Sequence, residues 1–413
     1  MIGRKSKNIL IGLDVGTTKI CTVVAEEIGD EIHILGIGHA PSQGLRKGVI
    51  INVDKAVEAI IQSVESAEEN SGVEINSVFA GIAGGHIQNI TSRGIVPVHK
   101  GDSGITDEDM RKVVDAAKAI SLPMEREIIQ VIPQEYIVDG EDGILNPRGM
   151  MGVRLEAVVN IITAAVSSAQ NIVKSINEAG VDVVGIILQP IASSIATLTQ
   201  TEKESGVVLI DIGGGTTDYA LHIDGAMRHT GVLAIGGDHI TNDIKIRFNI
   251  PNPKAEDVKT KFGCALSSLV PENEEFILPG TFGYPARSIL RTDLAEVIEA
   301  RLSEILEIVK IEIDKIGCAN QIGSGIVMTG GASLVPGTLE LAHKIFHVPV
   351  RLGIPNDMPG LTENFQSPVF STGIGLVLYG REHLREQGYV VLNGENKFLK
   401  IAQTMKNMIK KYF

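Results

Sequence analysis

Two short segments of the sequence each carry an aspartate, a glycine turn and two threonines, a combination that can bind phosphate. The first reads ILIGLDVGTTKICTVVA from Ile9, and the second reads VVLIDIGGGTTDYALHI from Val207. Glycine lets backbone N–H groups approach phosphate oxygens, and threonine hydroxyls add donors without adding charge. A single copy could equally be a tight hairpin turn. Two matched copies favour a nucleotide site in which two loops grip one polyphosphate from opposite sides.

The aspartates of these segments are candidates for binding a metal ion. Asp14 and Asp211 each end an apolar strand, where an unpaired carboxylate is costly. Mg²⁺ usually retains several of its waters in proteins. We therefore expect Asp14 and Asp211 to hold Mg²⁺ through water, with Asp218 as a further candidate for the metal or for positioning water.

The elements that must position these residues alternate between strands and helices. Each segment predicts a buried strand, a turn and a second β-branched strand, which is a hairpin, and its repetition indicates a duplicated domain. A third glycine-rich strand end, GIVMTGGASLVPG from Gly325, lies between helical patterns at 294–316 and 338–345. An amphipathic helix is expected at 54–70. The pattern predicts an α/β fold.

Two further segments interrupt this pattern. Residues 86–161 contain the strand-like SRGIVPV, a helical TDEDMRKVVDAAKAI that Thr106 can cap with Asp109 nearby, and two more strand-like runs. This order of β, α, β, β predicts a small inserted domain. The stretch 249–318 reads as mostly helical, with a turn-rich LPGTFGYPARS inside it.

Five motifs together resemble those of the actin, Hsp70 and sugar-kinase superfamily. LDVGTTK and IDIGGGTTD are similar to its two phosphate motifs, and GIVMTGGASLVPG is similar to its adenosine motif. LQPIASSIATL and SPVFSTGIGLV resemble the two connecting helices that form its hinge. All five occur in the family order. The resemblance implies two actin-like (ribonuclease H-like) α/β halves around an ATP cleft.

The same resemblance implies which residues would serve the nucleotide. Gln189 would orient water on the γ-phosphate with Asp211 assisting, and because an amide cannot easily accept a proton, turnover should be slow. LAIGGDHITNDI and AEDVKTKFG are similar to the family's segments near the phosphates and the ribose. The expected ATP contacts are Asp14, Gly16, Thr17, Thr18, Lys19, Gly213, Gly214, Gly215, Thr216, Thr217, Gly236, Gly237, Glu256, Lys259, Gly330 and Gly331.

Within the superfamily the sequence is most similar to the FtsA family of bacterial cell-division proteins, over essentially the whole chain. KSKNILIGLDVGTTKI, GLRKGVI and IPQEYIVDG carry this similarity. It implies an insert in place of actin's second subdomain. It also implies an ATP-binding, filament-forming protein that links FtsZ to the inner face of the cytoplasmic membrane at the division site and helps to recruit other division proteins.

The family resemblance places the site for the FtsZ C-terminal peptide in the helical subdomain. There Arg287, Arg291 and Arg301 could meet an acidic and hydrophobic tail peptide. The alternative is that these arginines are solvated helix charges paired with Glu296 or Glu304.

The end of the sequence, NKFLKIAQTMKNMIKKYF, has the pattern of a helix that lies on a membrane surface. Apolar residues recur at steps of three and four, and the five lysines give a charge of +5 with no acid among them. The alternative is a terminal helix that packs on the protein's own core. The expected membrane contacts are the apolar Phe398, Leu399, Ile401, Met405, Met408, Ile409, Tyr412 and Phe413 and the basic Lys397, Lys400, Lys406, Lys410 and Lys411.

These interpretations divide the chain as follows: 1–85, first actin-like half, N-terminal part; 86–161, inserted subdomain; 162–205, first half, connecting part; 206–248, second half, phosphate-binding part; 249–318, helical subdomain; 319–380, second half, adenosine motif and closing helix; 381–396, linker; 397–413, membrane-targeting helix.

Composition and charge exclude several other classes of protein. The formal net charge of −13 opposes a generic nucleic-acid binder, and three widely spaced cysteines suggest neither a disulfide framework nor a zinc site. Two rival functions remain. A sugar kinase would need a substrate pocket and a catalytic aspartate between the halves, and an FtsA-like scaffold of a pilus or other membrane assembly would need no lipid-binding helix of its own.

Overall fold

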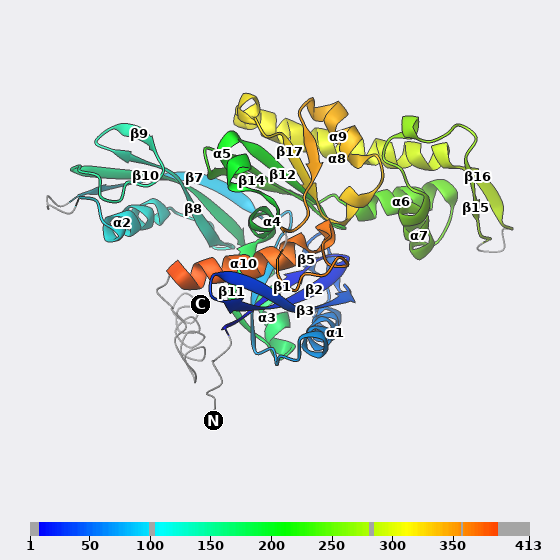
Figure 1. Cartoon of the computed structure of the whole chain (residues 1–413), viewed down its shortest axis with the longest axis horizontal. Coiled ribbons are helices and arrows are strands. Elements are labelled where there is room, and N and C mark those ends of the chain that lie inside the picture. The colour runs from blue at the N-terminus through cyan, green and yellow to red at the C-terminus, as the bar shows by residue number, and fades with distance from the viewer. Residues whose placement is uncertain (1–7, 99–103, 281–284, 357, 387–413) are drawn as a thin grey trace.

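The structure is a computed structural model in which residues 8–98, 104–280, 285–356 and 358–386 are described. Two five-stranded sheets form its two halves, one below the other in Figure 1. The first sheet has the order β3-β2-β1-β6-β11 and contains β1 (Asn8–Val15), β2 (Lys19–Ile28), β3 (Glu31–Pro41), β6 (Ser77–Ile82) and β11 (Asp182–Leu188). The second has the order β14-β13-β12-β17-β18 and contains β12 (Val207–Ile212), β13 (Thr217–Ile223), β14 (Ala226–Leu233), β17 (Ile326–Thr329) and β18 (Val350–Leu352).

The two sheets have the same topology. In each, the first three strands form an antiparallel meander, and the first strand also pairs in parallel with a strand that follows a helix. A fifth strand adds in parallel at the edge. The predicted duplication of an α/β domain is confirmed, because the hairpins β1–β2 and β12–β13 occupy equivalent places in the two halves.

Helices cover the sheets and join the halves. The first half carries α1 (Val53–Ser71) and α3 (Val166–Glu178), with β4 (Leu45–Arg46) and β5 (Val49–Ile50) as a short hairpin. The Asn52 side chain caps α1 by accepting from the N–H of Lys55, and Gly72 ends that helix with φ of 66°. The second half carries α5 (Gln200–Ser205), α6 (Gly237–Phe248), α7 (Asn252–Phe262), α8 (Arg291–Ile316) and α9 (Thr338–Phe346).

Two helices cross between the halves: α4 (Gln189–Thr197) and α10 (Ser371–Glu386). A Cβ on Gly375 of α10 would overlap the carbonyl oxygen of Ala192 in α4, so the helices meet backbone to backbone. The helix α10 continues to Glu386. The prediction that the linker 381–396 begins at residue 381 was therefore wrong. The Arg385 guanidinium bonds Glu27 and Asp30, which holds the end of α10 against the β2–β3 turn.

The insert forms a subdomain of its own at one end of the molecule in Figure 1. Its antiparallel sheet has the order β7-β10-β8-β9, with α2 packed on one face. Thr106 caps α2 in a capping box with Asp109, as predicted. The polar strand β9 was not predicted, because EDGI lacks the apolar alternation of a strand; among the described strands it pairs only with β8. The elements are β7 (Gln88–Pro97), α2 (Asp107–Lys118), β8 (Arg126–Val138), β9 (Glu141–Ile144) and β10 (Arg154–Ala165).

The helical subdomain lies at the opposite end of the molecule (Figure 1). Its helices α6, α7 and α8 share the hydrophobic core of the second half. The strands β15 (Glu275–Leu278) and β16 (Arg287–Leu290) form a hairpin at the predicted turn-rich stretch. Within the described residues, no helix is both long enough and apolar enough to cross a lipid bilayer. The predicted membrane helix at 397–413 lies outside the described residues.

Candidate nucleotide-binding site

A cavity of about 480 Å³ lies between the two halves, and both predicted phosphate loops line it. This volume falls within the range of roughly 300 to 1,000 Å³ that small-ligand sites occupy. Residues 14–19 connect β1 to β2 and form one wall, and residues 213–216 connect β12 to β13 and form the facing wall. Gly237 and Asp238, at the N-terminus of α6, also line the cavity, and their N–H groups donate to the carbonyls of Gly213 and Gly214 at 2.9 and 2.8 Å, which fixes the second loop on this helix.

The structure brings most of the predicted ATP contacts together around this cavity. All of them line it except Thr217 and Gly236. Thr217 is buried and donates its hydroxyl to the carbonyl of Ile235 at 2.8 Å, and Gly236 packs behind the loop against the carbonyls of Gly213 and Gly214. The structure thus places both residues behind the second phosphate loop, which they support, and not in the wall of the cavity.

The two phosphate loops approach each other so closely that only glycine fits at the contact. A Cβ on Gly214 would overlap the hydroxyl of Thr18, and a Cβ on Gly215 would overlap the side chain of Thr17. The Thr18 hydroxyl also donates to Asp238 across the cavity at 3.4 Å. The glycines of one half therefore set how closely the threonines of the other half can approach.

Three buried aspartates lie in this cavity, and each has a different hydrogen-bonding environment. Asp14 Oδ1 accepts from Gln189 Nε2 at 2.9 Å, and Asp211 Oδ2 accepts from the Ser193 hydroxyl at 2.8 Å. Asp218 Oδ2 accepts from the Thr216 hydroxyl at 3.1 Å. The other oxygen of Asp218 is buried and has no hydrogen-bond partner among the described residues.

Burial makes these three carboxylates costly to ionise. It raises the pKa of Asp14 to about 6, against the opposing effect of the nearby Lys19. Burial also raises the pKa of Asp211 and Asp218, and the charge of Asp211 raises the pKa of Asp218 further. A bound cation would relieve both the desolvation and the mutual repulsion.

The carboxylates fit a cation that is bound through water. Within the part of the chain that the structure describes, no three His, Cys, Asp or Glu side chains are grouped to hold a metal ion directly. Mg²⁺ commonly keeps several waters, and the orphaned oxygen of Asp218 is an acceptor suited to such a water. The donor set is therefore compatible with a hydrated Mg²⁺ ion that also contacts a polyphosphate.

Two lysines line the site, of which Lys19 is half-buried and Lys259 is buried. Lys19 donates to the carbonyl of Val369 at 2.6 Å and lies 4.2 Å from the centre of the Phe370 ring. Lys259 pairs with Glu256 at 2.7 Å and donates to the Thr241 hydroxyl at 2.8 Å. The predicted ribose contacts Glu256 and Lys259 thus lie side by side on α7, near the apolar segment 332–336.

Several residues that line the cavity were not predicted from the sequence. The N–H of Gly48 donates to the Thr17 hydroxyl at 3.0 Å, and Gly48 adopts a φ of 76° that favours glycine. Asp238 directly follows the glycine pair at 236–237, a signal that could have been used. Thr372 contacts the site from α10, and nothing local in its sequence indicates that.

The three candidate arginines of the helical subdomain all have partners within the chain. Arg291 pairs with Glu274 at 2.9 Å, and Arg301 pairs with Asp243 at 2.6 Å and with Glu304. Arg287 donates to the carbonyl of Phe248. The pairing of Arg301 with Glu304 is the alternative that the sequence left open.

Solved structures with a similar fold are actin-like proteins. The chain matches a PilM–PilN type IV pilus biogenesis complex with a TM-score of 0.64 at 17% identity, covering 90% of this chain and 98% of that one. It matches MreB5 of Spiroplasma citri bound to ADP with a TM-score of 0.51 at 16% identity, covering 92% and 97%. At these identities the likeness shows the fold alone, and it confirms the predicted actin-like fold.

Family models and curated relatives give a closer match. The model "Cell division protein FtsA" matches residues 208–375, and the model "SHS2 domain inserted in FTSA" matches residues 84–163. The curated FtsA of Pseudomonas aeruginosa is 42% identical over 92% of this chain and 91% of its own length. That of Escherichia coli K12 is 38% identical over 94% of both, and that of Bacillus subtilis is 35% identical over 93% and 86%. With such identity over nearly its whole length, the chain belongs to the FtsA family of cell-division proteins.

Proposed function

We propose that this cell-division protein binds ATP with Mg²⁺ in the cavity between its halves and, in that state, assembles into filaments. The filaments tether FtsZ to the inner face of the cytoplasmic membrane at the division site and help to recruit other division proteins. The observation that carries the proposal is the cavity itself, in which two glycine–threonine loops face each other over three buried aspartates.

The site is better suited to a conformational switch controlled by ATP binding than to rapid ATP hydrolysis. When bound, Mg²⁺ would supply charge neutralisation between the carboxylates and the phosphates. Gln189 lines the cavity, and its amide is held by Asp14, so it is placed to orient a water. An amide positions water but accepts a proton poorly, and Asp211 would assist. Slow hydrolysis is the expected result.

Self-association is supported by exposed apolar side chains at both ends of the molecule. The insert exposes Met151, Leu145 and Val153, and the helical subdomain exposes Ile246 and Ile277. Exposed apolar side chains are candidate contacts for self-association wherever they lie together in one patch. In Figure 1 these subdomains lie at opposite ends of the long axis, an arrangement that suits head-to-tail assembly.

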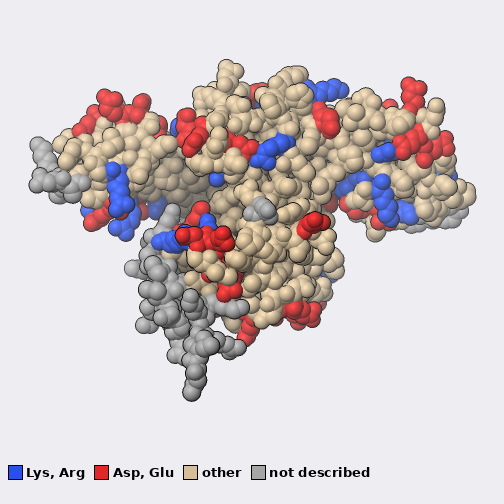
Figure 2. Space-filling model, viewed as in Figure 1, with Lys and Arg blue, Asp and Glu red and all other residues tan. Residues whose placement is uncertain are grey.

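Membrane attachment is proposed to come from the C-terminal segment. Figure 2 shows acidic and basic side chains interspersed on the visible face, with no broad basic surface over it. In the sequence, by contrast, five lysines lie within residues 397–413 of a chain with a net charge of −13. Each lysine near an anionic surface contributes about 1 kcal/mol, so one helix is a reversible anchor that filament formation would strengthen.

We predict that replacing Phe398 and Ile401 with glutamate abolishes sedimentation of the full chain with anionic liposomes and leaves ATP binding intact. The change places two charges on the apolar stripe that would lie among the acyl chains. A matched control, Gln403→Glu with Asn407→Glu, adds the same charge outside the stripe and should keep most of the binding. Equal sedimentation of the stripe variant and the unaltered chain would contradict the proposed anchor and favour the scaffold alternative.

The FtsZ peptide is proposed to bind the helical subdomain near Arg287. A cavity of about 240 Å³ lies there, lined by Phe248, Ile250, Leu278 and prolines, with Arg287 among the lining residues. Among the described residues, no carboxylate pairs with Arg287, whereas Arg291 and Arg301 already have acidic partners. A cavity that combines apolar side chains with a basic one is suited to an acidic and hydrophobic peptide.

We predict that Arg287→Glu weakens binding of the FtsZ C-terminal peptide about tenfold or more, which corresponds to about 1.4 kcal/mol. Arg291→Glu and Arg301→Glu should have smaller direct effects, because their charges are already neutralised within the chain. Fluorescence anisotropy with a labelled peptide measures this. The control Arg148→Glu makes the same charge change on the insert. Unchanged affinity in all three variants would remove these arginines from the site.

A further inference from the structure

The helix α4 contacts the key aspartates of both halves with one face. Gln189 and Ser193 are four residues apart and therefore lie one above the other on the helix surface. Gln189 donates to Asp14 of the first half at 2.9 Å, and Ser193 donates to Asp211 of the second half at 2.8 Å. Gln189 is 8% exposed and Ser193 is fully buried.

A second hydroxyl from the other connecting helix reaches the same oxygen of Asp211. Thr372 of α10 lies 3.4 Å from Asp211 Oδ2, and its hydroxyl lies 3.0 Å from that of Ser193. The opposite carboxylate oxygen, Oδ1, lies against Gly330, where any Cβ would overlap it. The orientation of this carboxylate is thus fixed from both sides.

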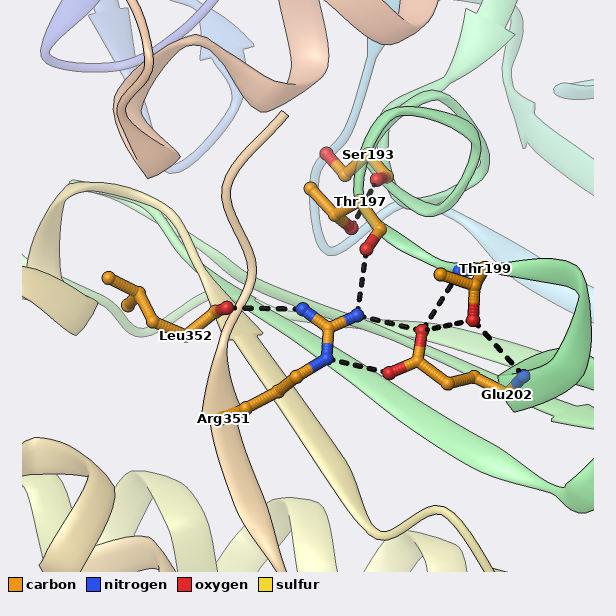
Figure 3. A network of polar contacts seen from close by, with 6 residues as sticks. All are labelled: Ser193, Thr197, Thr199, Glu202, Arg351 and Leu352. Carbon is orange, nitrogen blue, oxygen red and sulfur yellow. Dashed lines mark hydrogen bonds and ion pairs between the residues drawn. The ribbon is translucent and has the colours of Figure 1, made fainter. Parts of the chain in front are cut away.

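The C-terminal end of α4 is anchored to the second half, as Figure 3 shows. Thr197 donates its hydroxyl to the carbonyl of Ser193 at 2.7 Å, and Arg351 of β18 donates to the carbonyl of Thr197 at 2.9 Å. Arg351 also forms a bidentate ion pair with Glu202 at 2.6 and 2.7 Å. This ion pair lowers the pKa of Glu202 from its ordinary value of 4.5 to about 2, so the pair persists to a lower pH than an ordinary glutamate would allow.

We propose that Ser193 is a positioning residue for the nucleotide site. Its hydroxyl fixes the Asp211 carboxylate, and its place one turn after Gln189 sets the separation of the aspartates of the two halves. The Arg351–Glu202 pair fixes the position of α4, and therefore the position of Ser193 beside Asp211. This inference rests on the proposed binding of Mg²⁺ and ATP at that site.

Loss of the Ser193 hydroxyl should therefore lower the affinity for ATP in the presence of Mg²⁺ and leave the affinity without Mg²⁺ unchanged. A hydrogen bond to a charged group typically contributes enough to change an equilibrium about tenfold. If Ser193 orients Asp211, its loss should weaken the contact that Asp211 makes to a hydrated cation. ATP bound without Mg²⁺ makes no such contact and should be unaffected.

The test is equilibrium titration of the full chain with a fluorescent ATP analogue, over a range of Mg²⁺ concentrations and in EDTA. Ser193→Ala should raise the Mg²⁺ concentration for half-maximal affinity about tenfold and leave the affinity in EDTA unchanged. The matched control is Ser194→Ala, which removes a neighbouring buried hydroxyl that bonds His222 instead of an aspartate. That control should leave the Mg²⁺ dependence unchanged.

A second pair of variants covers the case in which Ser193→Ala fails to fold. Thr372→Val removes the other hydroxyl at nearly constant shape and should shift the Mg²⁺ dependence by a smaller factor. Thr372→Ser keeps that hydroxyl and should show the Mg²⁺ dependence of the unaltered chain. An equal loss of affinity with and without Mg²⁺, or the same shift from Ser194→Ala, would overturn the assignment of Ser193. If the unaltered chain shows no Mg²⁺-dependent ATP binding, the proposed function itself fails.

Discussion

Replacing Asp14 with asparagine should stabilise the nucleotide-free protein at neutral pH by about 3 kcal/mol and abolish Mg²⁺-dependent ATP binding. The carboxyl has an ordinary pKa of 3.8, and burial raises it to about 6. Each pKa unit corresponds to about 1.4 kcal/mol, so the ionised Asp14 side chain destabilises the nucleotide-free protein by roughly 3 kcal/mol. Asparagine keeps the oxygen that accepts from Gln189 and carries no charge. The change also removes one of the charges that raise the pKa of Asp218.

The pH dependence of this effect has a definite sign. Below a pH of about 3.8 the Asp14 carboxyl is protonated in both the folded and the unfolded chain, so it contributes no penalty. As the pH rises towards about 6, the unfolded chain ionises first, and the folded protein loses stability relative to the Asp14→Asn variant. Above that pH the difference between the two proteins stays constant.

Urea unfolding at a series of pH values measures this difference. The control Asp182→Asn makes the same chemical change at an exposed strand start and should alter stability by no more than about 0.5 kcal/mol at any pH. Lower stability of Asp14→Asn at neutral pH, or a gain that persists in acid, would contradict the assigned burial of the carboxylate.

The sequence predicted the parts of the site that are local. Asp14 and Asp211 are the last residues but one of the apolar strands β1 and β12, and the glycine loops follow these strands directly, so the pattern consists of adjacent residues. Their repetition then predicted that two loops face each other. Thr217 and Gly236 belong to the same motifs, but the direction of a side chain at the edge of a turn depends on packing behind the loop.

The parts that could not be predicted depend on contacts between distant elements. Thr372 and Ser193 meet at Asp211 only because α4 and α10 cross, and they lie far apart in the sequence. The bond from Arg351 to the end of α4 requires the edge strand β18 to lie beside the α4–α5 connection. The strand β9 forms because β8 offers it an edge, and its own residues indicate a turn.

The second large effect should come from Gly214, where the two halves touch. Gly214→Ala should reduce ATP affinity about a hundredfold, because the added Cβ would overlap the hydroxyl of Thr18 and force the phosphate loops apart. Overpacking of this kind costs about 1 to 3 kcal/mol, and the upper end of that range corresponds to a hundredfold change. Isothermal titration calorimetry with Mg²⁺ and ATP measures the change.

The halves can relieve the Gly214→Ala overlap by separating, so the unfolding temperature should change little while the loss of affinity is large. The control Gly85→Ala adds the same methyl where the nearest atom, on Ala234, is 3.5 Å away, and it should retain ATP affinity. Combining Gly214→Ala with Thr18→Ala removes the overlapping hydroxyl and should restore part of the affinity. Additive losses in the double variant would show that Gly214 acts independently of Thr18, and the loops would then not set each other's spacing.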